Sequence, residues 1–91
     1  MKFLVIYDKE TEREFFLNFS FITNIYPSER NKKSVSIRIN MSNGCSCILY
    51  YDASPITHNS TDMQRSLESI RDAIILEHAH CRIECDRIYF E

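Results

Sequence analysis

The chain has 91 residues, of which 44% are hydrophobic, and its 13 acidic and 11 basic residues leave a formal net charge of −2. We expect residues 1–91 to form a single domain that buries a core without needing disulfides or metal ions. The balanced charge argues against a strongly basic nucleic-acid binder, whose affinity would rest on neutralising phosphates, and against an acidic mimic of nucleic acid. Protein or small-molecule partners are therefore the default expectation.

The N-terminal segment does not have the pattern of an export signal. Lys2 is followed by five apolar residues, but Asp8 ends the run before it reaches the length of a signal peptide. No other stretch approaches the length of a membrane span. We therefore expect a cytoplasmic protein with no membrane partner, in which the four cysteines start out reduced.

The first third of the chain predicts two strands. Residues 2–7 are apolar on both faces, which is typical of a central strand. Apolar residues then alternate over residues 15–26, with a change of phase near Ile22 that indicates a bulge or bend. Pro27 is expected to end this strand, because proline cannot donate to a β-ladder, and residues 28–33 are expected to form a polar loop.

A β-hairpin is predicted between Val35 and Tyr51. Apolar and polar residues alternate along its first half, and Gly44, the only glycine of the chain, follows where a tight turn needs a positive φ. A two-residue turn made by Asn43 and Gly44 would point Cys47 and its alternate neighbours away from the core. A three-residue turn would point the same side chains into the core. We favour the three-residue turn, because it gathers more apolar surface on one face.

One helix is predicted after a loop at residues 52–60. Thr61 and Gln64, three residues later, match a capping box at its start. The apolar stripe that faces the sheet consists of Met63, Leu67, Ile70 and Ile74. A further β segment follows at residues 81–90. The order ββββαβ predicts an α+β fold, with an antiparallel β-sheet of about five strands and one amphipathic helix packed on one face.

One group of side chains has metal-ligating chemistry. Its members are Cys45, Cys47, His80, Cys81 and Cys85. Four such ligands could close a structural zinc site, but a Cys-x-Cys pair on a flat strand separates its thiols more than the turns of known zinc sites do. Free cysteine is more often a small buried residue. We expect core packing and no cofactor, with zinc or a disulfide as the alternatives.

The sequence contains no recognisable catalytic motif. Cys81, His80 and Asp86 are the residue types of a nucleophile, a base and an orienting acid. Adjacent strand residues point to opposite faces, however, so this spacing does not assemble them. A single glycine also rules out a glycine-rich phosphate loop. We expect no enzymatic activity.

Candidate binding residues combine the only basic patch of the chain with an aromatic side chain. They are Arg30, Lys32, Lys33, Arg38 and Tyr50. Basic residues interleaved with aromatic ones can bind single-stranded nucleic acid, and tyrosine and arginine also anchor protein interfaces. The alternative is that the basic residues form a solvated loop that discourages pairing between sheet edges.

Part of the chain resembles a known family. The residues that carry the resemblance are Phe16-Leu17-Asn18, Ile22-Thr23-Asn24-Ile25, Val35-Ser36-Ile37 and Ser42-Asn43-Gly44. This pattern, within residues 2–52, resembles FlbD-like small flagellar proteins and implies a small antiparallel sheet. The chain departs from that family in its long loop, its helix and its C-terminal β segment, so the flagellar role is not carried over.

In size and composition the chain also resembles short phage or mobile-element accessory proteins, a group that includes anti-CRISPR inhibitors. We therefore expect a non-catalytic protein-binding module, in the form of an inhibitor of a host defence protein. The alternative is a small nucleic-acid-binding regulatory protein that uses the basic loop from Arg30 to Lys33. Formation of a homodimer is compatible with both functions.

Overall fold

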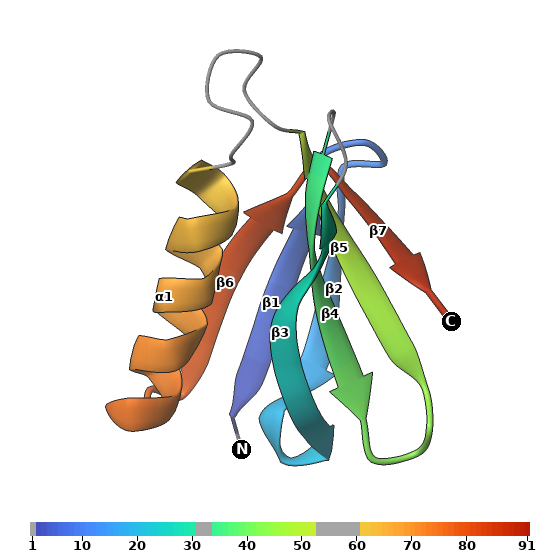
Figure 1. The fold of residues 1–91 in the computed structure, drawn as a ribbon. Helices are drawn as coiled ribbons and strands as arrows, with labels where there is room; N and C mark the ends of the chain where they lie inside the picture. Colours follow the sequence, from blue (N-terminus) through green and yellow to red (C-terminus); the bar gives the residue numbers. More distant parts are fainter. Residues whose placement is uncertain (1, 31–33, 53–60) are drawn as a thin grey trace.

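The computed structural model describes residues 2–30, 34–52 and 61–91, so the expected loop at residues 52–60 lies almost entirely outside the described residues. The described part contains seven strands and one α-helix (Figure 1). In chain order they are β1 (Phe3–Asp8), β2 (Arg13–Asn18), β3 (Ile22–Arg30), β4 (Ser34–Met41), β5 (Ser46–Asp52), α1 (Thr61–Ile75), β6 (His80–Cys85) and β7 (Arg87–Phe90). The predicted α+β class is confirmed.

The strands form two sheets rather than the single antiparallel sheet of about five strands that the sequence predicts. One sheet has the order β2-β1-β6 and the other the order β3-β4-β5-β7. In the first sheet β1 pairs antiparallel with β2 and parallel with β6, so this sheet is mixed. β1 is the central strand of this sheet, as predicted, with Leu4 and Ile6 buried on its inner face and Phe3, Val5 and Tyr7 half-buried on the other.

The hairpin between β4 and β5 has the predicted three-residue turn. The N–H of Met41 donates to the carbonyl of Cys45 (2.9 Å), and Ile39 lies opposite Cys47. Gly44 has a φ of +86°, which is the left-handed conformation that the turn requires. Cys47, with Leu49 and Tyr51, is therefore buried as expected, whereas Cys45 at the turn is exposed.

The bend predicted near Ile22 is a turn of 3₁₀ helix at Phe19–Phe21, where the chain leaves the first sheet and enters the second. The side chain of Asn18 caps this turn by accepting a hydrogen bond from the N–H of Ser20 (2.9 Å). The prediction that Pro27 ends the strand is wrong, because β3 continues to Arg30. Since β3 is an edge strand, a residue without an N–H is tolerated on its open side.

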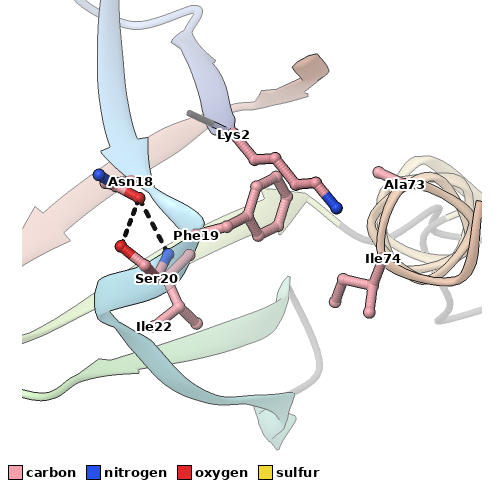
Figure 2. Close-up of a pocket in the computed structure, with 7 residues that line it drawn as sticks. All are labelled: Lys2, Asn18, Phe19, Ser20, Ile22, Ala73 and Ile74. Atoms are coloured by element: carbon pink, nitrogen blue, oxygen red, sulfur yellow. Dashed lines mark hydrogen bonds between the residues drawn. The ribbon is translucent and has the colours of Figure 1, made fainter. Parts of the chain in front are cut away.

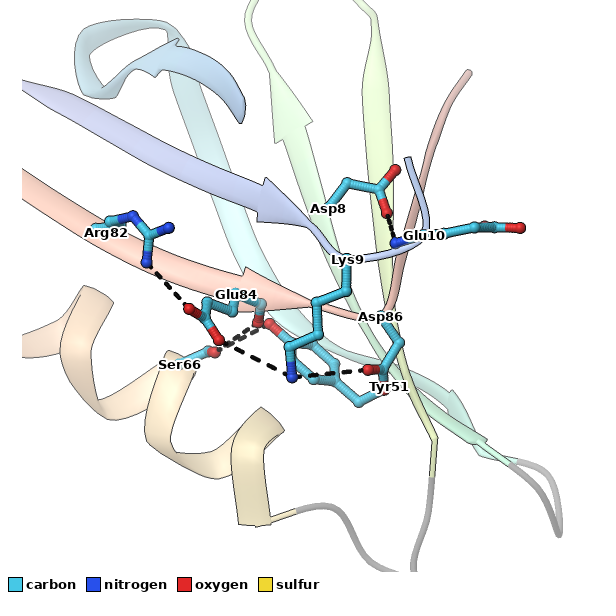
Figure 3. Close-up of polar contacts among 8 residues, drawn as sticks. All are labelled: Asp8, Lys9, Glu10, Tyr51, Ser66, Arg82, Glu84 and Asp86. Atoms are coloured by element: carbon cyan, nitrogen blue, oxygen red, sulfur yellow. Dashed lines mark hydrogen bonds and ion pairs between the residues drawn. The ribbon is translucent and has the colours of Figure 1, made fainter. Parts of the chain in front are cut away.

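The helix begins at Thr61, in agreement with the predicted start, and lies beside β6 (Figure 1). Its buried residues are Met63, Ser66, Ile70 and Ala73. The predicted stripe is therefore rotated, since Ile74 is 55% exposed and the small residues Ser66 and Ala73 let the helix approach the sheet closely. The hydroxyl of Tyr51 donates to Oγ of Ser66 (3.0 Å), which fastens the helix to β5 (Figure 3).

The C-terminal segment, predicted as one strand, consists of two strands in different sheets. At Asp86 the backbone N–H donates to the carbonyl of Tyr50 (2.9 Å), so the chain leaves the first sheet here and joins β5. Lys9 lies between the carboxylates of Glu84 and Asp86, at 3.9 Å from each (Figure 3). The passage of the chain from β6 to β7 at Asp86 therefore connects the two sheets at one end.

The core contains apolar residues from both sheets and from the helix. Leu4 and Ile6 come from the first sheet, Ile37 and Leu49 from the second, and Ile70 from α1. Because the two sheets share this core, neither sheet buries its inner face without the other. The helix in the described part of the chain is too short and too polar to span a membrane.

Candidate functional site

The outer face of the four-stranded sheet gathers tyrosine and arginine side chains. Tyr26, Arg38, Ile48 and Tyr89 form one row across the four strands, and Tyr50 and Arg87 are paired in the next row. The alternate residues of the same strands, such as Ile37 and Leu49, point into the core. We call the surface made by Tyr26, Arg38, Tyr50, Arg87 and Tyr89 the tyrosine–arginine face.

The aromatic rings of this face contact one another and an arginine. The rings of Tyr50 and Tyr89 meet edge to face, with centroids 5.4 Å apart and an interplanar angle of 87°. The guanidinium carbon of Arg87 lies 5.5 Å from the ring centroid of Tyr50, within the range of a cation–π contact. Tyr89 is still 53% exposed and Tyr26 is 37% exposed, so both rings remain accessible.

Arg38 is held in place by a polar cluster at the edge of the face. Its Nη2 atom forms an ion pair with the carboxylate of Glu91 and donates to Oγ of Ser46 (3.4 Å). The Ser46 hydroxyl in turn donates to the same carboxylate (3.3 Å). Glu91 therefore offsets the charge of Arg38, which reduces what Arg38 can offer to a phosphate group.

Two of the five predicted binding residues lie on the tyrosine–arginine face. Arg38 and Tyr50 lie on the same outer face, in neighbouring rows. Arg30 is the last residue of β3, whereas Lys32 and Lys33 lie outside the described residues. The sequence reasoning missed Arg87 and Tyr89 as members of the site. The alternation of residues 87–90 is the available signal, but in the sequence it continues from Cys81 and predicts a single strand over residues 81–90.

The residues of the alternative zinc site are spread over the fold. Cys45 is exposed at the hairpin turn, and Cys81 and Cys85 lie at opposite ends of β6. Four residues of strand span about 13 Å, which is far more than two thiolates on one zinc ion allow. In the described part of the chain, no three cysteine, histidine or acidic residues come together to hold a metal. All four cysteines are free thiols.

Three of the four thiols are buried, as the packing interpretation predicts. Burial raises the pKa of Cys47 to about 11. Burial, with smaller contributions from neighbouring charges, raises the pKa of Cys85 to about 12. Such thiols stay protonated at neutral pH, whereas nucleophiles and metal ligands need the thiolate. Cys81 is buried while its neighbour His80 is exposed, so this nucleophile–base pair is not assembled.

Comparison of the chain with protein-family models, curated proteins and solved structures gave no match. The resemblance to FlbD-like proteins therefore stays a likeness of residue patterns.

Proposed function

We propose that this chain is a non-catalytic protein-binding module that contacts its partner through the tyrosine–arginine face. The observation that carries the proposal is the placing of three tyrosines and two arginines on the outer face of one sheet, where Tyr26 and Tyr89 are exposed. Tyrosine and arginine are over-represented among the residues that contribute most to protein–protein binding energy. They combine a large apolar area with a polar group that can still form hydrogen bonds.

The contacts within the face favour binding further, because they already order its side chains. The ring of Tyr50 contacts both Tyr89 and Arg87, and Arg38 is held by Glu91. Ordering a flexible side chain on binding costs roughly 0.5–1.5 kcal/mol, so a face that is ordered beforehand loses less free energy. This supports a rigid docking surface.

More specifically, we propose that the partner is a host defence enzyme and that binding inhibits it. This identification of the partner is supported by the small size and composition of the chain, which resemble those of phage accessory proteins. An inhibitor without catalytic groups must act by covering a surface of its target. The tyrosine–arginine face could serve in this way.

The test uses a pair of exposed aromatic positions. Proteins captured from the native host by the wild-type chain would be compared with those captured by Tyr26→Ala/Tyr89→Ala and by Phe16→Ser. Phe16 is 66% exposed on β2, away from the face, and is the matched control. Loss of a binding anchor costs about 2 kcal/mol, so the double variant should bind a specific partner at least about 30-fold more weakly.

We expect the same partner to be retained by wild type and by Phe16→Ser. A partner retained equally by Tyr26→Ala/Tyr89→Ala would contradict the assignment of the face, and the absence of any specific partner would contradict the function. If the only captured protein is a second copy of the chain, the face is a homodimer interface rather than an inhibitory surface.

Nucleic-acid binding is the second candidate, favoured by the aromatic rings and arginines on one sheet face. Bases stack on such rings, and the predicted basic residues Arg30, Lys32 and Lys33 would contact phosphates. The Arg38–Glu91 ion pair and the net charge of −2 weigh against it. It predicts binding to a single-stranded oligonucleotide that weakens steeply between about 50 and 200 mM salt. Absence of binding at the lower salt concentration would remove this candidate.

A further inference from the structure

A groove runs between α1 and the edge strand β3, on a different surface from the tyrosine–arginine face. It consists of two adjoining cavities of about 630 and 360 Å³, which share Ile22 and Ile74 as lining residues. Leu67 and Ile70 of the helix line the second cavity opposite Ile25 of the strand. The groove is therefore long, open and largely apolar.

The strand β3 turns its edge towards this groove. Four consecutive residues, Ile22 to Ile25, line the second cavity, and a strand that presented one face would contribute alternate residues. No described strand pairs with this side of β3, since the sheet order ends there. Such an edge offers backbone N–H and C=O groups for pairing with another extended segment.

The register of the β4–β5 hairpin shows which backbone groups of β3 point away from the sheet. The N–H of Met41 donates to the carbonyl of Cys45, so Met41 directs its backbone groups towards β5. Backbone direction alternates along a strand, so Arg38, three residues earlier, directs its own groups towards β3. Tyr26, opposite Arg38, then directs its own towards β4. The N–H and C=O of Ile25 consequently point away from the sheet, on the side of the groove. Pro27, the next residue with this direction, has no N–H, which limits pairing to a short segment.

A positive charge lies at the end of the groove where β3 begins. The side chain of Lys2 extends past the ring of Phe19, and its ammonium points towards Ala73 of α1 (Figure 2). Among the described residues, no carboxylate lies within ion-pair distance of Lys2. An anionic group of a ligand at this end would gain a charge-assisted hydrogen bond beside apolar walls.

We propose that the groove binds the C-terminal residues of a partner protein as a short extended strand, with the terminal carboxylate at Lys2. Since β3 runs away from Lys2, a strand paired antiparallel with β3 runs towards it and ends there with its C-terminus. A parallel strand would bring an N-terminal ammonium to Lys2, and like charges repel. Backbone hydrogen bonds with Ile25 fix the register of the peptide, and the apolar walls of the groove contact its alternate side chains.

The test uses short acetylated peptides whose last positions are randomised over apolar residues, serine and threonine, with either a free C-terminal carboxylate or an amide. Peptides retained by the immobilised full chain would be identified by mass spectrometry and titrated individually. We expect retained free-acid peptides to bind about five- to tenfold more tightly than their amides. In Lys2→Met this difference should disappear, because the variant keeps the length of the side chain and loses its charge.

Lys9→Met is the matched control, since it removes the same charge from the other end of β1, and it should keep the difference between acid and amide. Ile74→Glu, at a half-exposed position that lines both cavities, should abolish binding of every peptide without unfolding the chain. Retention of no peptide, or an equal preference for the acid in Lys2→Met, would overturn the proposal. So would tighter binding of dodecanoate than of any peptide, because the groove would then be an acyl site. None of these results depends on the tyrosine–arginine face.

Discussion

Two glutamates occupy left-handed backbone positions, which usually belong to glycine. Glu12 has a φ of +56° in the β1–β2 turn, and Glu77 has a φ of +55° after the helix. Glu77 is the centre of a Schellman motif, in which the N–H of His78 donates to the carbonyl of Ala73 (2.9 Å). The motif satisfies carbonyls at the helix end, but a residue with a Cβ is strained there.

Replacing Glu77 with glycine should therefore stabilise the protein. We expect Glu77→Gly to raise the free energy of unfolding by about 0.5–1 kcal/mol, a few degrees in Tm, because glycine adopts this φ without strain. Glu77→Ala separates this effect from the loss of a negative charge near the helix C-terminus, since alanine keeps the strain. Thermal melting of the three proteins is the measurement. An equal gain in both variants would attribute the effect to charge alone.

At the scale of elements, the Ser66 side chain links the helix to both sheets, because its hydroxyl accepts from Tyr51 of β5 and donates to the carbonyl of Glu84 in β6 (3.5 Å). The hydroxyl of Tyr51 donates to Oγ of Ser66, and both side chains are buried. We expect Tyr51→Phe to destabilise by about 1 kcal/mol, since Ser66 keeps its hydrogen bond to Glu84, and Ser66→Ala by about 1–2 kcal/mol, since it leaves the buried hydroxyl of Tyr51 without its partner. The double variant should cost less than the sum of the two, by about 0.5–1.5 kcal/mol.

Urea unfolding of the four proteins in this cycle measures the coupling energy. Ser69→Ala, at an exposed position of the same helix, controls for the change in helix propensity from serine to alanine. Strict additivity of the two substitutions would mean that the hydrogen bond does not fasten the helix.

The elements that the sequence predicts correctly are those with local determinants. The β4–β5 turn follows from Gly44 and the alternation around it, and the helix start follows from the periodicity after Thr61. The division of residues 80–90 between two sheets could not be predicted, because both halves alternate and only the backbone of Asp86 marks the break. The continuation of β3 through Pro27 depends on β3 being an edge strand, which no local pattern reveals.

The same distinction applies to the candidate site. Arg38 and Tyr50 could be placed together, because they belong to one hairpin. Arg87 and Tyr89 join them through pairing between β5 and β7, which are separated in sequence by the whole helix and by β6. The groove depends likewise on how α1 lies against β3, and no periodicity within either element specifies this arrangement.

At the scale of the whole molecule, both sheets contribute protonated thiols to one core. Cys47 belongs to the second sheet and Cys85 to the first, and both are almost fully buried. Burial raises the pKa of Cys47 to about 11 and, as the largest cause, that of Cys85 to about 12. Burial also raises the pKa of Tyr51 above its usual range. In the unfolded chain, thiols titrate near pH 8.5.

The stability of the fold should therefore decline in alkaline solution. Between about pH 9 and 11 the unfolded chain has released its thiol protons while the folded chain still holds them, so rising pH favours unfolding. Each buried thiol contributes at most about 1.4 kcal/mol per pH unit to this slope, and its stabilising effect is fully present below about pH 8.

Urea unfolding under reducing conditions, repeated from about pH 8 to 11, measures the slope. Cys47→Ala should be less stable at every pH, because of the cavity it leaves, but its stability should fall less steeply. Cys45→Ser removes the exposed thiol and should leave the slope of the wild type unchanged. If Cys47→Ala and wild type lost stability equally over this range, the Cys47 thiol would make no contribution to alkaline unfolding.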